Sequence, residues 1–214
     1  MIAMSFLGKL FSAPIEVYQA LLNVYVAGGL NVQLLQKDDP GAFGHEHTIK
    51  IAGRNVELVT IHPKSGVQKG GGASIGPSFS KSSQAMKPKF SFNHIVVGLA
   101  GKNPADLKVE LKPVTKGFLS KETVDLSWEG GRLAATLNAD PELKRKLLEE
   151  QASEVSVSAD EKNNAIQIEY VAKVKDIVET KGFVVKQTTT RFEELPPMGV
   201  FEICDKIAGY AKSV

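Results

Sequence analysis

The chain of 214 residues has one cysteine, Cys204, and one tryptophan, and its charges lack a dominant sign. A single cysteine forms no disulfide within the chain, which excludes a disulfide-built secreted scaffold and favours a reducing compartment such as the cytoplasm. The 26 basic residues are nearly balanced by 24 acidic residues, for a net charge of +2. This balance argues against a dedicated nucleic-acid-binding protein, because such a protein normally has a strong basic excess.

The usual catalytic signatures are also missing. The sequence contains no Gly-x-Ser-x-Gly, no Cys-x-x-Cys and no Gly-x-Gly-x-x-Gly after a strand. Cys204 falls on the apolar stripe of a C-terminal helical pattern, where a free thiol behaves as a small buried hydrophobe. The sequence therefore identifies no catalytic residue and no organic cofactor, and it leaves open whether the protein is an enzyme.

Long uninterrupted apolar runs are absent, although the first 35 residues are poor in charge. Residues 1–35 contain only Lys9 and Glu16 as charged side chains, and polar residues and Gly28-Gly29 interrupt the best membrane-spanning window, residues 17–35. Only parts of a secretory signal are present. We expect a cytoplasmic protein whose apolar residues 1–12 either pack on the core or contact a protein partner or a membrane surface.

Short strands with alternating apolar residues make up much of the rest. Residues 90–99 and 106–114 are predicted to be two strands joined by a loop, and 155–174 to be a β-hairpin. A further hairpin is predicted over residues 122–137, with Gly130-Gly131 as its turn and Leu126 opposite Ala135. Residues 183–191 are predicted to form another strand.

Three helices are predicted from spacing and capping residues. One follows Pro14 and ends at Gly28-Gly29, and a central one begins with Asp140 as N-cap and Pro141. The last, residues 197–214, has one apolar stripe, formed by Val200, Ile203, Cys204, Ile207, Ala208 and Ala211. Hairpins combined with helices at both ends and one in the middle predict an antiparallel α+β fold.

The chain is predicted to be a single domain, 1–214, with a flexible Gly/Ser/Lys-rich loop at about 63–90. That loop also allows a division into 1–62 and 90–214. No acidic residue occurs between Glu57 and Asp106, an interval rich in lysine: Lys64, Lys69, Lys81, Lys87, Lys89 and Lys102. It is interpreted as a solvated loop or as a site for an anion, an acidic partner or an anionic membrane.

Three of the four histidines cluster within residues 45–62. If Ile51 pairs with Val56 in a hairpin, then His45, His47 and His62 share one face, because side chains alternate with period two. Three imidazoles on one face predict a site for a divalent transition metal. The alternative interpretation is that these histidines are solvated or hydrogen-bonded at the end of an apolar hairpin.

Two functions follow from these patterns. The first is a binding or scaffolding protein without identifiable catalysis, which docks on a partner, on a second copy of itself or on a membrane through residues 1–12 and the basic loop. The alternative is a metal-dependent enzyme that uses His45, His47 and His62.

Overall fold

The structure of the protein is a computed structural model that describes residues 13–42, 44–64, 84–86, 88–99, 101–116, 122–152, 154–181 and 187–214. Its helices are α2 (Ile15–Ala27), α3 (Pro104–Leu107), α4 (Leu133–Asn138), α5 (Pro141–Glu149) and α6 (Met198–Ser213). Its strands are β1 (Asn31–Gln36), β2 (His47–Ala52), β3 (Leu58–Lys64), β4 (Gln84–Met86), β5 (Lys89–Val97), β6 (Val109–Lys116), β7 (Glu122–Gly130), β8 (Val155–Asp160), β9 (Ala165–Lys173), β10 (Lys175–Lys181) and β11 (Gln187–Glu193).

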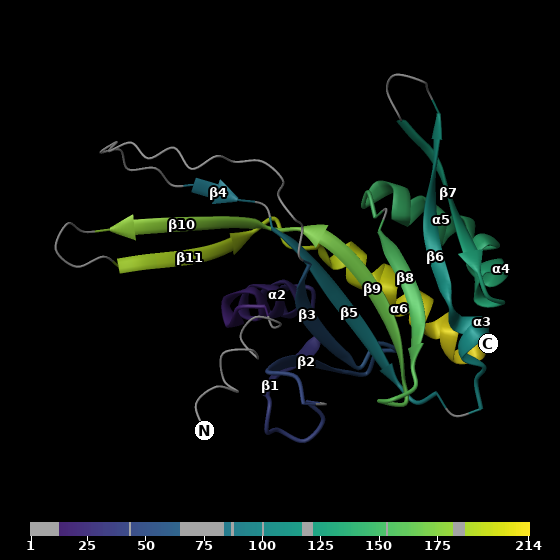
Figure 1. Ribbon diagram of the computed structural model, residues 1–214, viewed down its shortest axis with the longest axis horizontal. Helices are drawn as coiled ribbons and strands as arrows, with labels where there is room; N and C mark the ends of the chain where they lie inside the picture. Colours follow the sequence, from purple (N-terminus) through teal and green to yellow (C-terminus); the bar gives the residue numbers. More distant parts are fainter. Residues whose placement is uncertain are drawn as a thin grey trace.

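An eight-stranded antiparallel sheet forms the body of the protein, in the order β1-β2-β3-β5-β9-β8-β6-β7. A smaller three-stranded sheet, β11-β10-β4, projects from it, because β9 continues into β10 almost without interruption (Figure 1). The predicted antiparallel α+β class is confirmed. The central strands come from both sides of the basic loop, since β3 pairs with β5.

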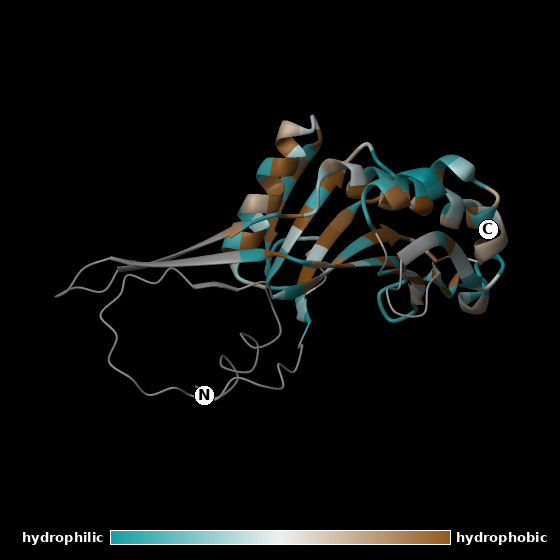
Figure 2. Ribbon diagram, turned by 90° about the horizontal axis from the view of Figure 1, so that it is seen from above, coloured by the Kyte–Doolittle hydropathy of each residue, from teal (hydrophilic) through white to brown (hydrophobic). Residues whose placement is uncertain are grey.

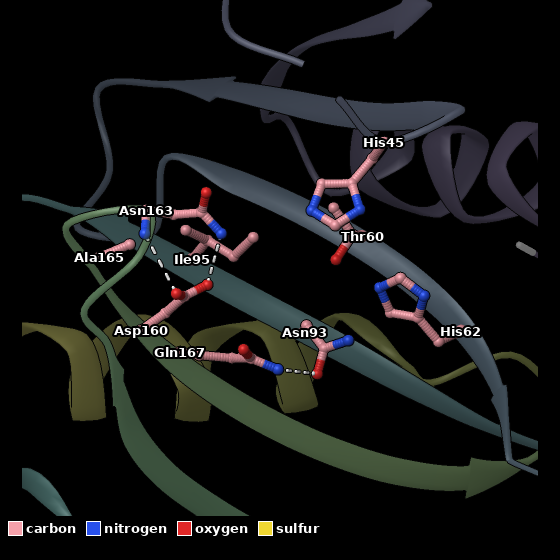
Figure 3. A pocket seen from close by; sticks show the side chains of 9 residues that line it. All are labelled: His45, Thr60, His62, Asn93, Ile95, Asp160, Asn163, Ala165 and Gln167. Carbon is pink, nitrogen blue, oxygen red and sulfur yellow. Dashed lines mark hydrogen bonds between the residues drawn. The ribbon is translucent and has the colours of Figure 1, made fainter. Parts of the chain in front are cut away.

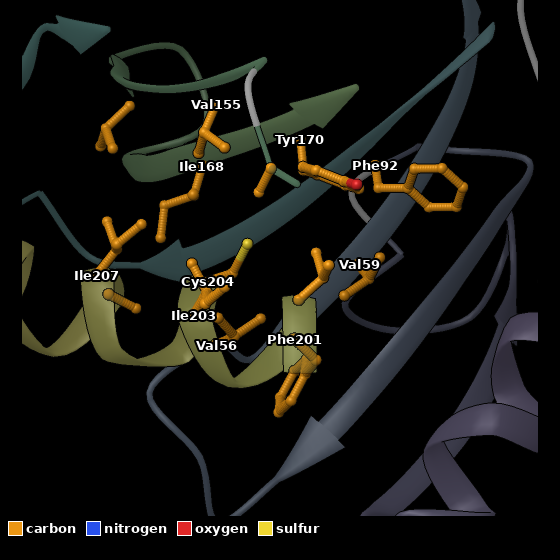
Figure 4. Close-up of a cluster of buried hydrophobic side chains, with 14 of the residues drawn as sticks. Val56, Val59, Phe92, Val155, Ile168, Tyr170, Phe201, Ile203, Cys204 and Ile207 are labelled. Atoms are coloured by element: carbon orange, nitrogen blue, oxygen red, sulfur yellow. The ribbon is translucent and has the colours of Figure 1, made fainter. Parts of the chain in front are cut away.

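One face of the large sheet is apolar and carries the helices. On β5 and β9 it presents Phe92, Val96, Ile166 and Ile168, which are under 2% exposed. Side chains from α2, α4, α5 and α6 join these residues in a single core cluster. Figure 4 shows α6 directing Phe201, Ile203, Cys204 and Ile207 towards the strands.

The strand residues between these apolar positions point to the opposite face, which is largely polar. Figure 2 shows the resulting mixture of hydrophobic and hydrophilic residues along the sheet. Among the described residues, none of the four helices α2, α4, α5 and α6 covers that second face, because all four contribute to the single core cluster. We call this second face the open face of the sheet.

Several local predictions are confirmed. The helix after Pro14 is α2 and buries Tyr18 and Leu21. Asp140 is the N-cap of α5, where its carboxylate accepts bonds from the backbone N–H of Glu142 and Leu143. The predicted hairpin over 155–174 is β8–β9, and α6 buries all six residues of the predicted stripe.

The hairpin predicted over residues 122–137 is wrong, because only its first half is a strand. Strand β7 pairs with β6, and the residues after Gly131 form helix α4. The Asn138 side chain ties that helix to β7, since its amide accepts from Trp128 N and donates to Trp128 O, both at 2.8 Å. Gly130, with a φ of +121°, passes so close to β6 that a Cβ would lie 2.2 Å from Lys108 O.

The predicted strands at 90–99 and 106–114 correspond to β5 and β6, which β9 and β8 separate in the sheet. The second predicted strand started too early, because residues 104–107 form α3. Among the described residues, no helix combines the length and the apolar character needed to cross a bilayer.

Candidate functional site

The open face carries polar side chains that are almost completely buried. Thr60 is 1% exposed, Ser91 2% and Asn93 3%. The strand register places them side by side, with Thr60 opposite Asn93 and Asn93 opposite Glu169. Hydrogen-bonding side chains are thus buried at the centre of this face.

A loop covers the β1–β3 end of the same face. It runs from Lys37 to Glu46 and is held by the Thr48 hydroxyl, which donates to Ala42 O at 3.3 Å. Leu35, Ala42 and Leu58 are buried here but do not belong to the main core cluster. The loop therefore has an apolar anchor of its own, and this anchor fixes the position of His45 near its end.

Between this loop and the β8–β9 turn lies a small pocket of about 60 Å³, which we call the trough. Its floor comes from three strands, and its walls from His45 and His62 at one end and from Asp160 and Asn163 at the other (Figure 3). The floor residues are Thr60, Asn93, Ile95, Ala165 and Gln167. Figure 3 shows the Thr60 hydroxyl directed into this space.

A hydrogen-bond network fixes one side of the trough. Gln167 Nε2 donates to Asn93 Oδ1 at 2.7 Å, and Ser91 Oγ donates to Glu169 Oε1 at 2.6 Å. Lys64 Nζ also contacts Glu169 Oε1, at 2.5 Å. Burial by itself would raise the pKa of Glu169, but the bonds from Lys64 and Ser91 outweigh it and hold the pKa below its usual value.

The opposite wall is fixed by the β8–β9 turn. Asp160 accepts from the backbone N–H of Asn163 at 3.2 Å and from its Nδ2 at 2.7 Å. These bonds hold the carboxylate in position at the edge of the trough, where Figure 3 shows it across from the two imidazoles. The trough thus has a fixed negative charge at one end and neutral amide and hydroxyl groups on its floor.

His45 and His62 approach each other at the other end, with ring centroids 5.4 Å apart and planes at 61°. The pKa of His45 is lowered, first by burial and then by the neighbouring His62, while Asp160 acts in the opposite direction. A lowered pKa keeps the His45 ring neutral near pH 7. Its ring nitrogens are then one donor and one acceptor, which suits polar recognition or metal binding.

The structure does not bring His47 to this pair. The observed register pairs Ile49 with Val59, one residue away from the prediction, and this shift moves His47 to the other face. There it packs edge-on against Tyr18 of α2, with ring centroids 5.5 Å apart. Hence the predicted sharing of one face by all three histidines is wrong, although two of them do meet.

Within the described residues, no group of three or more His, Cys, Asp or Glu side chains is placed to hold a metal ion. His94, on β5, points into the apolar core, where it is 1% exposed. Of the predicted basic cluster, Lys64 is paired with Glu169 and Lys89 with Glu154. Lys69, Lys81, Lys87 and the apolar segment 1–12 lie outside the described residues.

A wider and shallower groove of about 500 Å³ lies over β6, β7 and β8. Its lining includes Lys112 and Glu110, whose charges are paired with each other at 2.6 Å. The groove lacks buried polar groups directed into it, so it is a weaker candidate than the trough.

Sequence reasoning missed most of the trough, including Thr60, Asn93, Asp160, Asn163 and Gln167. A signal was present, because polar residues occupy every second position in strands that are otherwise apolar. Thr60 and His62 alternate in β3, Ser91 and Asn93 in β5, and Gln167 and Glu169 in β9. These positions meet only because the strand order is β3-β5-β9. The alternation within a single strand does not predict that order.

No protein-family model, no curated protein and no solved structure matches this chain.

Proposed function

We propose that the protein is a non-catalytic binding protein that takes a small polar ligand, or a polar group of a larger one, in the trough. The observation that carries this proposal is the burial of Thr60, Ser91 and Asn93 at the centre of the open sheet face. Burying hydroxyl and amide groups is costly, and on this face Ser91 and Asn93 offset that cost through bonds with Glu169 and Gln167, while the Thr60 hydroxyl is directed into the trough. Binding sites commonly retain such groups because they fix and select a ligand.

The lining indicates the chemistry of the ligand. The Thr60 hydroxyl and the amides of Asn93 and Gln167 offer both donors and acceptors, and Asp160 adds a fixed acceptor. An anionic group would lie close to the Asp160 carboxylate, so we expect neutral or cationic groups to be preferred. A volume of about 60 Å³ is small, which suits a single amide, hydroxyl or amine group.

The proposal is tested by mapping small probes onto the backbone amides by ¹H–¹⁵N NMR. Acetamide, urea and ethanolamine should shift the amides of Thr60, Asn93 and Gln167, while acetate at the same concentration should shift them much less. Thr60→Val should weaken the effect of the three favoured probes. Shifts that fall elsewhere on the protein, or that are equally large for acetate, would contradict the proposal.

A metal-dependent enzyme remains the second candidate, and the approach of His45 to His62 is the observation that favours it. Its weakness is that His47 lies on the other face of the sheet. Docking on a partner or an anionic membrane through residues 1–12 and the basic loop also remains a proposal. Removing residues 1–12 should abolish that association without changing the probe shifts in the trough.

A further inference from the structure

His45 and His62 come from elements with different anchors. His62 lies on β3, whereas His45 lies at the end of the loop that Thr48 and the apolar anchor hold against the open face. Their ring centroids are 5.4 Å apart. Both side chains are only partly buried, so both rings border the trough and can be reached from solvent.

This separation agrees with the geometry of a shared metal ion. Two imidazoles bound to one tetrahedral zinc ion through Zn–N bonds of about 2.1 Å have ring centres about 5 Å apart. The observed centroid distance of 5.4 Å is therefore compatible with one nitrogen of each ring binding a common ion. Imidazole is a preferred ligand of zinc, nickel and copper.

The surroundings supply the outer part of such a site. Asp160 lies across the trough and is held by two bonds from Asn163. A carboxylate in that position can accept a hydrogen bond from a metal-bound water, the usual role of acidic residues around metal ligands. The floor of the trough provides hydroxyl and amide groups beside any ligand that replaces the water.

We infer that His45 and His62 bind one divalent transition-metal ion of the zinc class, whose remaining coordination positions are open to water and to the ligand in the trough. The site differs from the three-histidine site predicted from the sequence, because His47 takes no part. In assigning the open positions to the trough ligand, the inference rests on the proposed function. Binding of the metal itself does not require that ligand.

The test uses the untagged full chain and zinc alone, followed by calorimetry and by ¹H–¹⁵N spectra of the histidine ring nitrogens. We expect one equivalent of zinc to bind and to shift the ring nitrogens of His45 and His62, leaving those of His47 and His94 unchanged. His45→Ala and His62→Ala should each weaken binding at least about tenfold, because a direct ligand contributes more than an outer-shell partner.

His47→Gln is the matched control, since it removes a neighbouring imidazole that faces α2. It should bind zinc as the wild type does. His45→Gln and His62→Gln serve as second variants of the two proposed ligands. Loss of zinc binding is measured only in variants whose far-ultraviolet circular dichroism matches that of the wild type. The inference is overturned if the wild type binds no zinc, if binding survives both alanine changes, or if His47→Gln abolishes it. Because no organic probe is present, failure here is distinct from failure of the acetamide and urea titration.

Discussion

His94 should make the stability of the protein depend strongly on pH. It is 1% exposed on the apolar face of β5, near the ring of Phe201 and with Nε2 3.5 Å from the hydroxyl of Tyr25. Burial lowers the pKa of His94 from its ordinary 6.5 to about 4. The folded protein therefore keeps this ring neutral at pH values where the unfolded chain protonates it.

The sign and size of the effect follow from proton linkage. Between pH 6.5 and pH 4 the unfolded state binds more protons than the folded state, so the free energy of unfolding falls as the pH falls. A difference of 2.5 pKa units corresponds to about 3 kcal/mol in full. From pH 7 to pH 5 the expected loss is about 2 kcal/mol. Above pH 5 most carboxylates remain ionised and contribute little to this change.

Urea unfolding at pH 7, 6 and 5 measures the loss, and His94→Gln tests its origin. The variant removes the titrating ring but keeps a polar group near Tyr25, so it should be less stable at pH 7 yet nearly independent of pH down to pH 5. His45→Gln is the control at a half-buried, solvent-reachable histidine and should retain most of the wild-type pH dependence. The reasoning is refuted if His94→Gln loses as much stability as the wild type between pH 7 and pH 5.

Three further predictions concern side-chain hydrogen bonds to the backbone and the thiol. Asn138→Ala removes two hydrogen bonds to the backbone of Trp128 and should lower the free energy of unfolding, measured in urea, by about 1–3 kcal/mol. Tyr18→Phe should cost a similar amount, because the Tyr18 hydroxyl donates to Ile61 O at 3.1 Å and accepts from Ile61 N at 2.8 Å. Burial raises the pKa of the Cys204 thiol, so a thiol reagent should modify it only as fast as the protein unfolds.

The exposed Asn23 of α2 provides a control for the first two predictions, since Asn23→Ala removes an amide side chain from the surface. It should leave stability unchanged or slightly improved, because alanine favours the helix. A loss from Asn138→Ala or Tyr18→Phe no larger than that of Asn23→Ala would count against the structural role of these bonds. Rapid modification of Cys204 in the native protein would contradict its burial.

The sequence predicted the elements whose signals are local. The apolar stripe of α6, the Asp140 cap of α5 and the alternation in β8 and β9 each lie within one short segment, and each is present in the structure. The hairpin predicted over residues 122–137 is wrong because the pairing of its first strand is not decided within that segment. A Gly-Gly turn and apolar residues on both sides fit a hairpin locally, but β7 finds its partner in β6, and Asn138 bonds Trp128 from helix α4.

The candidate site was predictable only in part for the same reason. The prediction placed His45 opposite His62 within one hairpin, but His45 meets His62 from the loop before β2, and the exclusion of His47 depends on a register shift of one residue. That shift depends on where the turn between β2 and β3 begins, a point that alternation within each strand does not fix. Gln167 joins the trough because β9 pairs with β5, a strand distant in the sequence, and Asp160 is carried there by the β8–β9 hairpin.

The most direct test of the trough as a binding site is the free energy of unfolding of Thr60→Val beside that of Thr48→Val. Both threonines are buried on the open face, but the Thr48 hydroxyl holds the loop through Ala42 O. Thr48→Val should therefore cost about 1 kcal/mol or more. If the Thr60 hydroxyl is kept for a ligand, Thr60→Val should be as stable as the wild type or more stable. A loss equal to that of Thr48→Val would show that the hydroxyl serves the fold, and would contradict the account.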